Sequence, residues 1–221
     1  MDVCLKRIMK SGVTPERHWE GYADMMTSRR AFLAGTAAAL ATSSMPAWGQ
    51  AAPPTRVKVI DVHSHWYPPE WLELVEKEAV DNGATKIERN ARGFMVISIP
   101  GLGVTFQPQY TDIPSRLKAM DEKGVAIHVM SLTQPMVYWA KPEFGLRLSQ
   151  AFNNACSELH KKYPERFLGL AMLPMQSPDM SIAELDRVSK LPGIKGAYMS
   201  THVLGKNLDD KSFWPVYERC E

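Results

Sequence analysis

The sequence predicts an α/β fold, a TIM-like (β/α)8 barrel of which the chain holds about half, and three observations indicate it. From Val57 on, apolar runs of strand length alternate with longer segments of helical period, as in the βα units of a parallel sheet. The first run ends in His63 and His65 and is stopped by two prolines, which places both imidazoles at the carboxyl end of a strand. Only four clear strands follow from Ala51 on, whereas a complete barrel has eight strands and about 250 residues.

Residues 1–50 differ from the rest of the chain. Arg29 and Arg30 are followed by a weakly apolar, Ala-rich run, in the manner of a twin-arginine export signal. The run is shorter than the roughly 18 sustained apolar residues of a membrane span, so no stable span is expected. We expect an N-terminal extension and a cleaved signal, with an exported or periplasmic protein beginning near Ala51. An Ala-rich surface helix or linker is the alternative, and the protein is cytoplasmic if the signal is not used.

The composition is that of an ordinary globular protein. Of 221 residues, 45% are hydrophobic and 23% are charged, and the net charge is +2. Lys and Arg form no cluster in the body, so nucleic acid is an unlikely class of partner. Cys156 and Cys220 lie in no CxxC motif, and we interpret both as structural thiols.

The first expected strand, VKVIDVH, is followed by a long excursion over residues 66–110. It contains a predicted amphipathic helix around WLELVEKEAV and a small hairpin at GFMVISIPGLG. The excursion is too long for a simple βα loop, so it indicates an insertion near the mouth of the first strand.

Regular alternation then returns up to the last residue. TDIPSRLKAMDEKG predicts a helix ending at Gly124, and Pro164 stops a second, longer helix. The expected order is a helix in TDIPSRLKAMDEKG, a strand in VAIHVMSL, a helix in EFGLRLSQAFNNACSELHKKYP, a strand in RFLGLAMLPM, a helix in SPDMSIAELDRVSKLPG, a strand in IKGAYMSTH and a helix start in DDKSFWPVYERCE. Half a barrel leaves an apolar sheet edge unpaired.

Three histidines are candidate metal ligands. Side chains alternate along a strand, so His63 and His65 point to one side and Ser64 to the other. His202 closes the fourth clear strand and is expected at the same rim. Three imidazoles would leave coordination positions open for water and substrate, as a catalytic metal requires. The alternative is that these are hydrogen-bonded histidines without a metal.

Several motifs of the body carry a resemblance to a known family. They are IDVHSHWYP, RLKAMDEKGV, YWAKPE, NNAC, YPERFLGLAMLPMQSP and STHVLGKNLDDKSFWPVYE. In these motifs the chain from Val57 to Glu221 resembles the amidohydrolase superfamily, on the branch of 2-amino-3-carboxymuconate-6-semialdehyde decarboxylase and related decarboxylases.

The resemblance implies a metal-dependent hydrolase barrel that holds one divalent metal ion, with Zn²⁺ expected. His63, His65 and His202 match three of its ligands, while the aspartate ligand and the catalytic histidine are expected beyond Glu221. The chain is therefore expected to be the N-terminal part of such a barrel, with no catalytic acid or base assigned within it. The family assigns the third histidine to its fifth strand, which suggests one further strand in or near the insertion. A homodimer is also implied.

The function that follows is a metal-dependent decarboxylase, a carbon–carbon lyase, acting on a small unsaturated or aromatic carboxylic acid. A metal-dependent hydrolase of an amide, lactone or ester is the alternative, because the same histidines serve both chemistries. An inactive, truncated half-barrel is the second alternative. Trp139 and Lys141 follow the second strand and could line the substrate pocket, or could serve loop packing only.

Four other residues stand at positions that could belong to the site. Gln107 stands where the decarboxylase has a substrate-binding arginine. Arg92 is the nearest arginine on the N-terminal side and could replace it, but a solvent-exposed turn arginine is the favoured interpretation. Asp61 could orient a ligand or bind backbone. His128 lies within a strand and is interpreted as a core or wall residue.

Overall fold

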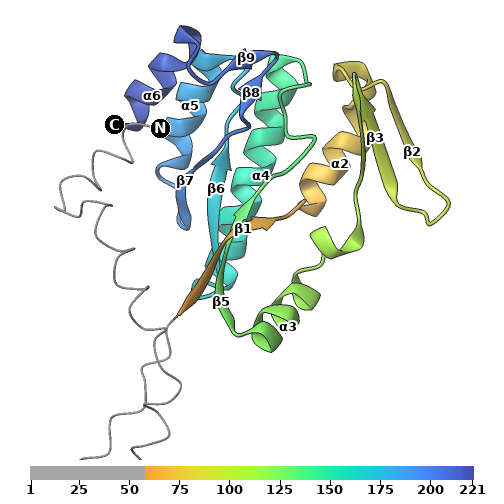
Figure 1. Ribbon diagram of the computed structural model, residues 1–221, viewed down its shortest axis with the longest axis vertical. Coiled ribbons are helices and arrows are strands. Elements are labelled where there is room, and N and C mark those ends of the chain that lie inside the picture. Colours follow the sequence, from red (N-terminus) through yellow and green to blue (C-terminus); the bar gives the residue numbers. More distant parts are fainter. Residues whose placement is uncertain (1–57) are drawn as a thin grey trace, which may run out of the picture. The chain divides into compact units, whose positions relative to one another are not determined.

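A parallel four-stranded sheet is the centre of the fold (Figure 1). The computed structural model describes residues 58–221, so the expected extension and signal in residues 1–50 lie outside the described residues. The strands stand in the order β1-β5-β6-β7, each parallel to its neighbour. They are β1 (Val59–His65), β5 (Val125–Ser131), β6 (Phe167–Met172) and β7 (Ile194–Tyr198). This confirms the four strands and the βα alternation expected from the sequence.

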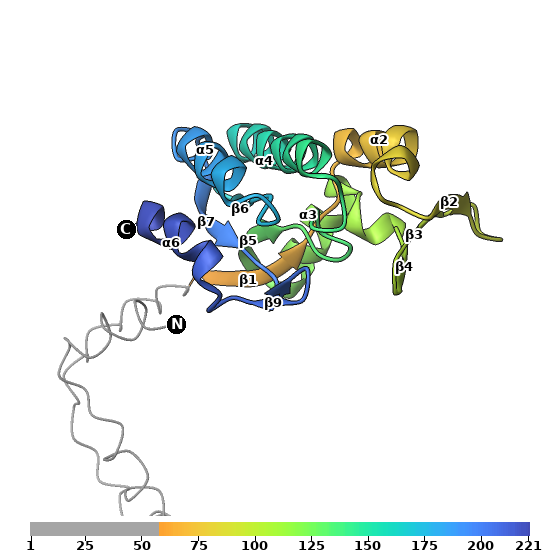
Figure 2. The ribbon, with the colours of Figure 1, turned by 90° about the horizontal axis from the view of Figure 1, so that it is seen from above.

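Helices that connect these strands cover one face of the sheet, where α4 and α5 lie side by side (Figure 2). The helices after the insertion are α3 (Ile113–Lys123), α4 (Pro142–Lys162), α5 (Pro178–Val188) and α6 (Trp214–Cys220), with a 3-10 turn η5 (Lys211–Phe213) before the last. Leu148 and Phe152 are four residues apart on α4 and completely buried, so one stripe of the helix forms the core. None of the described helices is both long enough and apolar enough to span a membrane.

Local signals set the helix ends, and those at Gly124 and Pro164 were expected from the sequence. The Asp112 side chain accepts a hydrogen bond of 3.2 Å from the backbone N–H of Ser115 and caps α3. Gly124 ends α3 with a φ of 69°, in the left-handed region that favours glycine. The helix α4 ends at Lys162, two residues before Pro164, because the residue before a proline disfavours helical geometry.

The insertion forms a second, antiparallel sheet of its own, in the order β2-β3-β4. Its elements are α2 (Pro69–Glu78), η3 (Val80–Asn82), β2 (Lys86–Arg89), β3 (Met95–Ile99), β4 (Leu102–Thr105) and η4 (Pro108–Tyr110). The N–H of Tyr67 donates to the carbonyl of Tyr110 at 2.9 Å, so the insertion leaves and returns at the end of β1. The expected hairpin is confirmed and gains a third strand. None of these strands joins the parallel sheet in the part of the chain that is described.

The end of the fourth strand differs from the expectation. The run IKGAYMSTH was expected to continue to His202, but β7 ends at Tyr198. Its partner β6 ends at Met172, opposite Tyr198, and Pro174 soon follows without an N–H for further pairing. His202 instead begins a short hairpin of β8 (His202–Val203) and β9 (Lys206–Asn207).

One edge of the parallel sheet exposes apolar side chains. Within residues 58–221, β1 pairs only with β5. Val59 and Ile60 are each 49% exposed and Val62 is 68% exposed, which is unusual for β-branched residues of a strand. The apolar sheet edge expected for a half-barrel is therefore present.

Candidate metal site

Two imidazoles face each other at the carboxyl end of β1. The Nε2 atoms of His63 and His65 are 3.0 Å apart, and the ring centroids are 4.6 Å apart. Ser64 points to the opposite side and is buried. Strand alternation produces this arrangement, as the sequence predicted.

The pair fits a metal ion by its chemistry and its spacing. A zinc–nitrogen bond is about 2.0–2.1 Å long, so one ion can contact two nitrogens that are 3.0 Å apart. The site lies where the strand ends, so further coordination positions face outward from β1. The two residues could therefore serve as two ligands of one divalent ion.

Burial favours the neutral form of the His65 imidazole. Desolvation lowers the pKa of His65, and the nearby His63 imidazole lowers the pKa further. A histidine binds a metal through a neutral ring nitrogen, so a lowered pKa keeps His65 available as a ligand in mildly acidic solution.

A polar cluster lies behind the pair, on the side of Ser64. The Ser64 Oγ is 2.9 Å from Nδ1 of His128 and accepts a hydrogen bond of 2.7 Å from Nη1 of Arg116 on α3. Asp61 accepts a hydrogen bond of 2.9 Å from the backbone N–H of His63, and its other oxygen is 3.6 Å from Nε2 of His128. Asp61 thus binds backbone, one of the two roles that the sequence left open, and His128 belongs to the polar cluster beside the strand.

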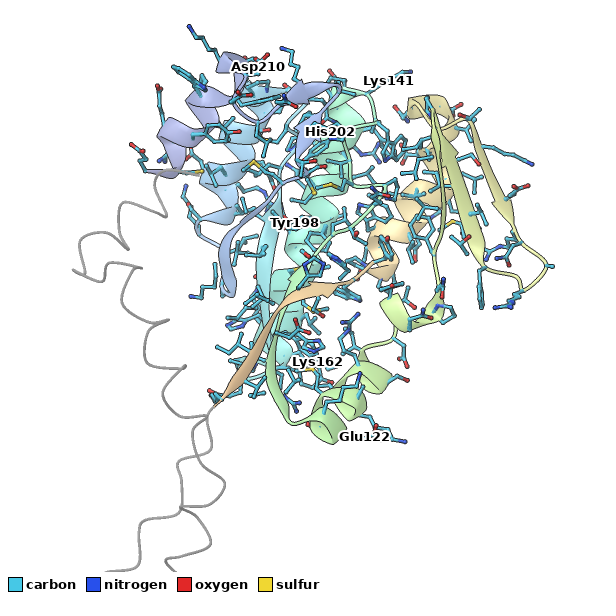
Figure 3. The ribbon with its side chains drawn as sticks, in the orientation of Figure 1. Glu122, Lys141, Lys162, Tyr198, His202 and Asp210 are labelled. Atoms are coloured by element: carbon cyan, nitrogen blue, oxygen red, sulfur yellow. The ribbon has the colours of Figure 1, made fainter. Side chains whose placement is uncertain are left out.

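Tyr198 is a site residue that sequence reasoning missed. Its ring centroid is 6.0 Å from that of His65, although β7 and β1 are opposite edges of the sheet. In a flat sheet the two strands would be about 14 Å apart, three spacings of about 4.8 Å. The sheet therefore curls toward a barrel, and Tyr198, at the end of β7 (Figure 3), approaches His65. Its position at a strand end was the available signal, but the strand was expected to end at His202.

His202 lies on the β8–β9 hairpin (Figure 3), where it is exposed and its Nδ1 is 3.2 Å from Oγ1 of Thr201. Among residues 58–221, no group of three or more His, Cys, Asp or Glu side chains is arranged to hold a metal ion. The structure thus brings His63 and His65 together but does not add His202 to them. Its role as third ligand stays a prediction.

Trp139 and Lys141 make hydrogen bonds within the loop and to the insertion. The indole N–H of Trp139 donates to the carbonyl of Met136 at 3.2 Å. The Lys141 ammonium donates to the carbonyl of Asp81, in η3, at 2.7 Å. These contacts serve loop packing, and a substrate-binding role for either residue stays a prediction.

Arg92 and Gln107 line one hollow of the insertion, with a volume of about 310 Å³. The hollow lies between the β2–β3 turn and the end of β4, and its lining residues include neither His63 nor His65. Arg92 therefore lies near Gln107, as it must if it takes the part of the arginine that the resembled decarboxylase has there. The hollow that the two residues share is separate from the histidine pair.

Known proteins resemble this chain over most of the described residues. A family model described as Amidohydrolase matches residues 60–221. 2-Amino-3-carboxymuconate-6-semialdehyde decarboxylase of Dictyostelium discoideum is 34% identical over 164 residues, covering 73% of this chain and 45% of that protein. Gamma-resorcylate decarboxylase of Polaromonas sp. is 34% identical over 103 residues, covering 46% of this chain and 30% of that protein.

Solved structures agree in fold. A dihydroxybenzoic acid decarboxylase of Polaromonas sp., crystallised with manganese and the inhibitor 2-nitroresorcinol, superposes with a TM-score of 0.55 at 26% identity, covering 73% of this chain and 46% of that one. The chain spans about half the length of two curated relatives that it matches, 45% of one and 47% of the other. Its four parallel strands are thus part of an α/β barrel, and the chain belongs to the amidohydrolase family, on the branch that resembles 2-amino-3-carboxymuconate-6-semialdehyde decarboxylase.

Proposed function

We propose that this chain supplies metal ligands to a decarboxylase that releases carbon dioxide from a small unsaturated or aromatic carboxylic acid. The observation that carries the proposal is the facing pair of His63 and His65 at the end of β1, with Nε2 atoms 3.0 Å apart. The matching curated relatives named above are decarboxylases, which favours this chemistry over hydrolysis.

Each residue of the site has a proposed part. His63 and His65 bind a divalent ion, zinc in our proposal because imidazole ligands suit it, and His202 is the proposed third ligand. The bound ion supplies a positive charge that polarises a substrate oxygen or a water molecule. Trp139 and Lys141 are proposed to contact the carboxylic acid, for which the Lys141 ammonium would have to leave the carbonyl of Asp81.

The metal site is tested first by metal content. Zinc-loaded protein is expected to retain about one ion per chain after gel filtration, and His65→Ala is expected to lose most of it, because one of two adjacent ligands is removed. His160→Asn is the matched control, since His160 lies on α4 and its Nδ1 is 2.8 Å from the carbonyl of Phe167. Full zinc occupancy in His65→Ala would contradict the assignment.

The reaction is tested on metal-loaded full-length protein with 2,6-dihydroxybenzoate and 5-carboxyvanillate, the substrates for which decarboxylases of similar fold are named. We expect release of carbon dioxide that depends on His63 and His65. Product release from amides, lactones or esters without carbon dioxide would assign the site to the hydrolase alternative. Bound metal with neither reaction would contradict the proposal of a decarboxylase.

We also propose export through the twin-arginine route, and a homodimer as the assembled form. The motif that motivates export, Arg29–Arg30, lies outside the described residues. Arg29→Lys combined with Arg30→Lys should retain the protein in the cytoplasm, measured by cell fractionation. Equal periplasmic amounts of the native protein and the double variant would contradict this export route. A monomeric mass in light scattering would contradict the dimer.

A further inference from the structure

We infer that Ser131 is a positioning residue that selects the tautomer of His65 and thereby leaves the Nε2 of His65 free to bind a metal. This inference rests on the proposed metal site, because it assigns a role in preparing one of its ligands. Ser131 is the last residue of β5, pairs directly with His65 across the sheet and is 1% exposed.

The Ser131 hydroxyl faces two groups, and the direction in which it donates decides the tautomer of His65. Its Oγ is 2.9 Å from Nδ1 of His65 and 3.5 Å from the carbonyl of Ser64. A hydroxyl has one hydrogen, and the carbonyl can only accept. When Ser131 donates to Ser64, it must accept from His65, so Nδ1 of His65 carries the proton and Nε2 is bare.

The backbone around the pair is held from the same side. Nη2 of Arg116 donates to the carbonyl of His65 at 2.6 Å, while Nη1 donates to the Oγ of Ser64 at 2.7 Å. These bonds are charge-assisted and therefore strong. Arg116 thus fixes the main chain from which the imidazole of His65 projects, and Ser131 fixes the ring itself.

The facing imidazole completes the arrangement. With Nε2 of His65 bare, the 3.0 Å contact to Nε2 of His63 requires that His63 donate its Nε2 proton to His65. A metal ion held by both Nε2 atoms would take the place of this proton, which would move to Nδ1 of His63 through solvent. Without the Ser131 hydroxyl, Nδ1 of His65 has no other side-chain partner among the described residues, and the Nε2–H form would turn a hydrogen toward the metal position.

Ring ¹⁵N spectra of the full chain without metal, at a pH above 8, measure the tautomer directly. His65 is assigned by the signal that disappears in His65→Ala. We expect Nδ1–H on His65 in the native chain and a shift toward Nε2–H in Ser131→Ala. Zinc dissociation constants, measured against a chromophoric chelator, should rise about 10–100-fold in Ser131→Ala, the usual effect of removing the partner of a metal-binding histidine.

Ser157→Ala is the matched control. Ser157 is 2% exposed on α4, and its Oγ has no hydrogen-bond partner among the described residues, so its loss should change neither the tautomer nor zinc affinity. The inference is overturned if native His65 carries Nε2–H, or if Ser131→Ala keeps both the tautomer and the zinc affinity. If Ser131→Ala does not fold, the native spectrum alone decides. The tautomer is read without metal or substrate, so failure of the proposed function would be a separate result.

Discussion

Asn153 on α4 joins a helix to the carboxyl end of β6, and its replacement by alanine should cost much of the stability of the sheet. The side chain is completely buried. Its Nδ2 donates to the carbonyl of Met172 at 2.9 Å and to Oε1 of Glu184 at 2.7 Å, and its Oδ1 accepts from the N–H of Met172 at 2.7 Å. Asn153→Ala leaves all three partners without this side chain.

The expected magnitude follows from these contacts. A buried backbone N–H or carbonyl that loses its partner costs about 1–3 kcal/mol, and Met172 would lose one of each. Glu184 keeps its two bonds from Arg187, of 2.8 and 2.7 Å, so its charge stays paired. We expect Asn153→Ala to lower the free energy of unfolding by about 3–5 kcal/mol, with a small cavity contributing to the upper value.

The next residue provides a control of the same type. Asn154 is exposed and only accepts one hydrogen bond, of 2.7 Å from Arg187, so Asn154→Ala should cost less than about 1 kcal/mol. Urea unfolding followed by tryptophan fluorescence measures both variants against the native chain. If the two midpoints shift equally, the reasoning about buried polar groups at the end of β6 is refuted.

Three further predictions concern reactivity, backbone geometry and pH. Alkylation of the folded chain at pH 8, mapped by peptide mass spectrometry, should modify exposed Cys220 and spare Cys156. Burial raises the pKa of the Cys156 thiol, so little of it is the reactive thiolate. Early labelling of Cys156 would contradict its burial. Gly193→Ala should lower the unfolding midpoint far more than Gly93→Ala. Both glycines have a positive φ, 85° and 76°, but only at Gly193 would the new Cβ lie 2.3 Å from the ring of His160 on α4. Equal shifts of the two midpoints would contradict this. Burial lowers the pKa of His128 below 6.5, so the folded state binds fewer protons than the unfolded state, and stability should fall as the pH drops below about 6.5. The charged groups that also act on this imidazole are Arg116, Asp61, Arg166 and Lys123. Stability measured between pH 7 and 5 should change less in His128→Gln, and an identical pH profile in both proteins would count against this assignment.

Local pattern accounts for much of the fold. Strand and helix segments follow from apolar periodicity, which depends on neighbouring residues, and helix ends follow from residues such as Asp112, Gly124 and Pro164. The facing of His63 and His65 was predictable for the same reason, because the two residues belong to one strand and alternation alone places them on one side.

The strand end before His202 was not predictable in this way. Residues 199–202 contain no Gly or Pro that would end a strand, but pairing of β7 stops where its neighbour β6 ends, and that limit is set by another part of the chain. The hairpin that carries His202 follows from this early end. A candidate ligand at an expected rim can therefore lie apart from the pair that it was expected to join.

The order of the parallel strands and their helices, and the histidine pair, follow from sequence alone, because each depends on residues close together in the chain. Which side chains surround that pair depends on the tertiary structure. Tyr198 reaches His65 because the sheet curls, and Ser131 meets it because β5 pairs with β1 in one register. Both contacts join segments more than sixty residues apart, and Ser131 and His65 are separated by 66 positions in the sequence. They therefore depend on strand pairing and curvature, which no local pattern encodes.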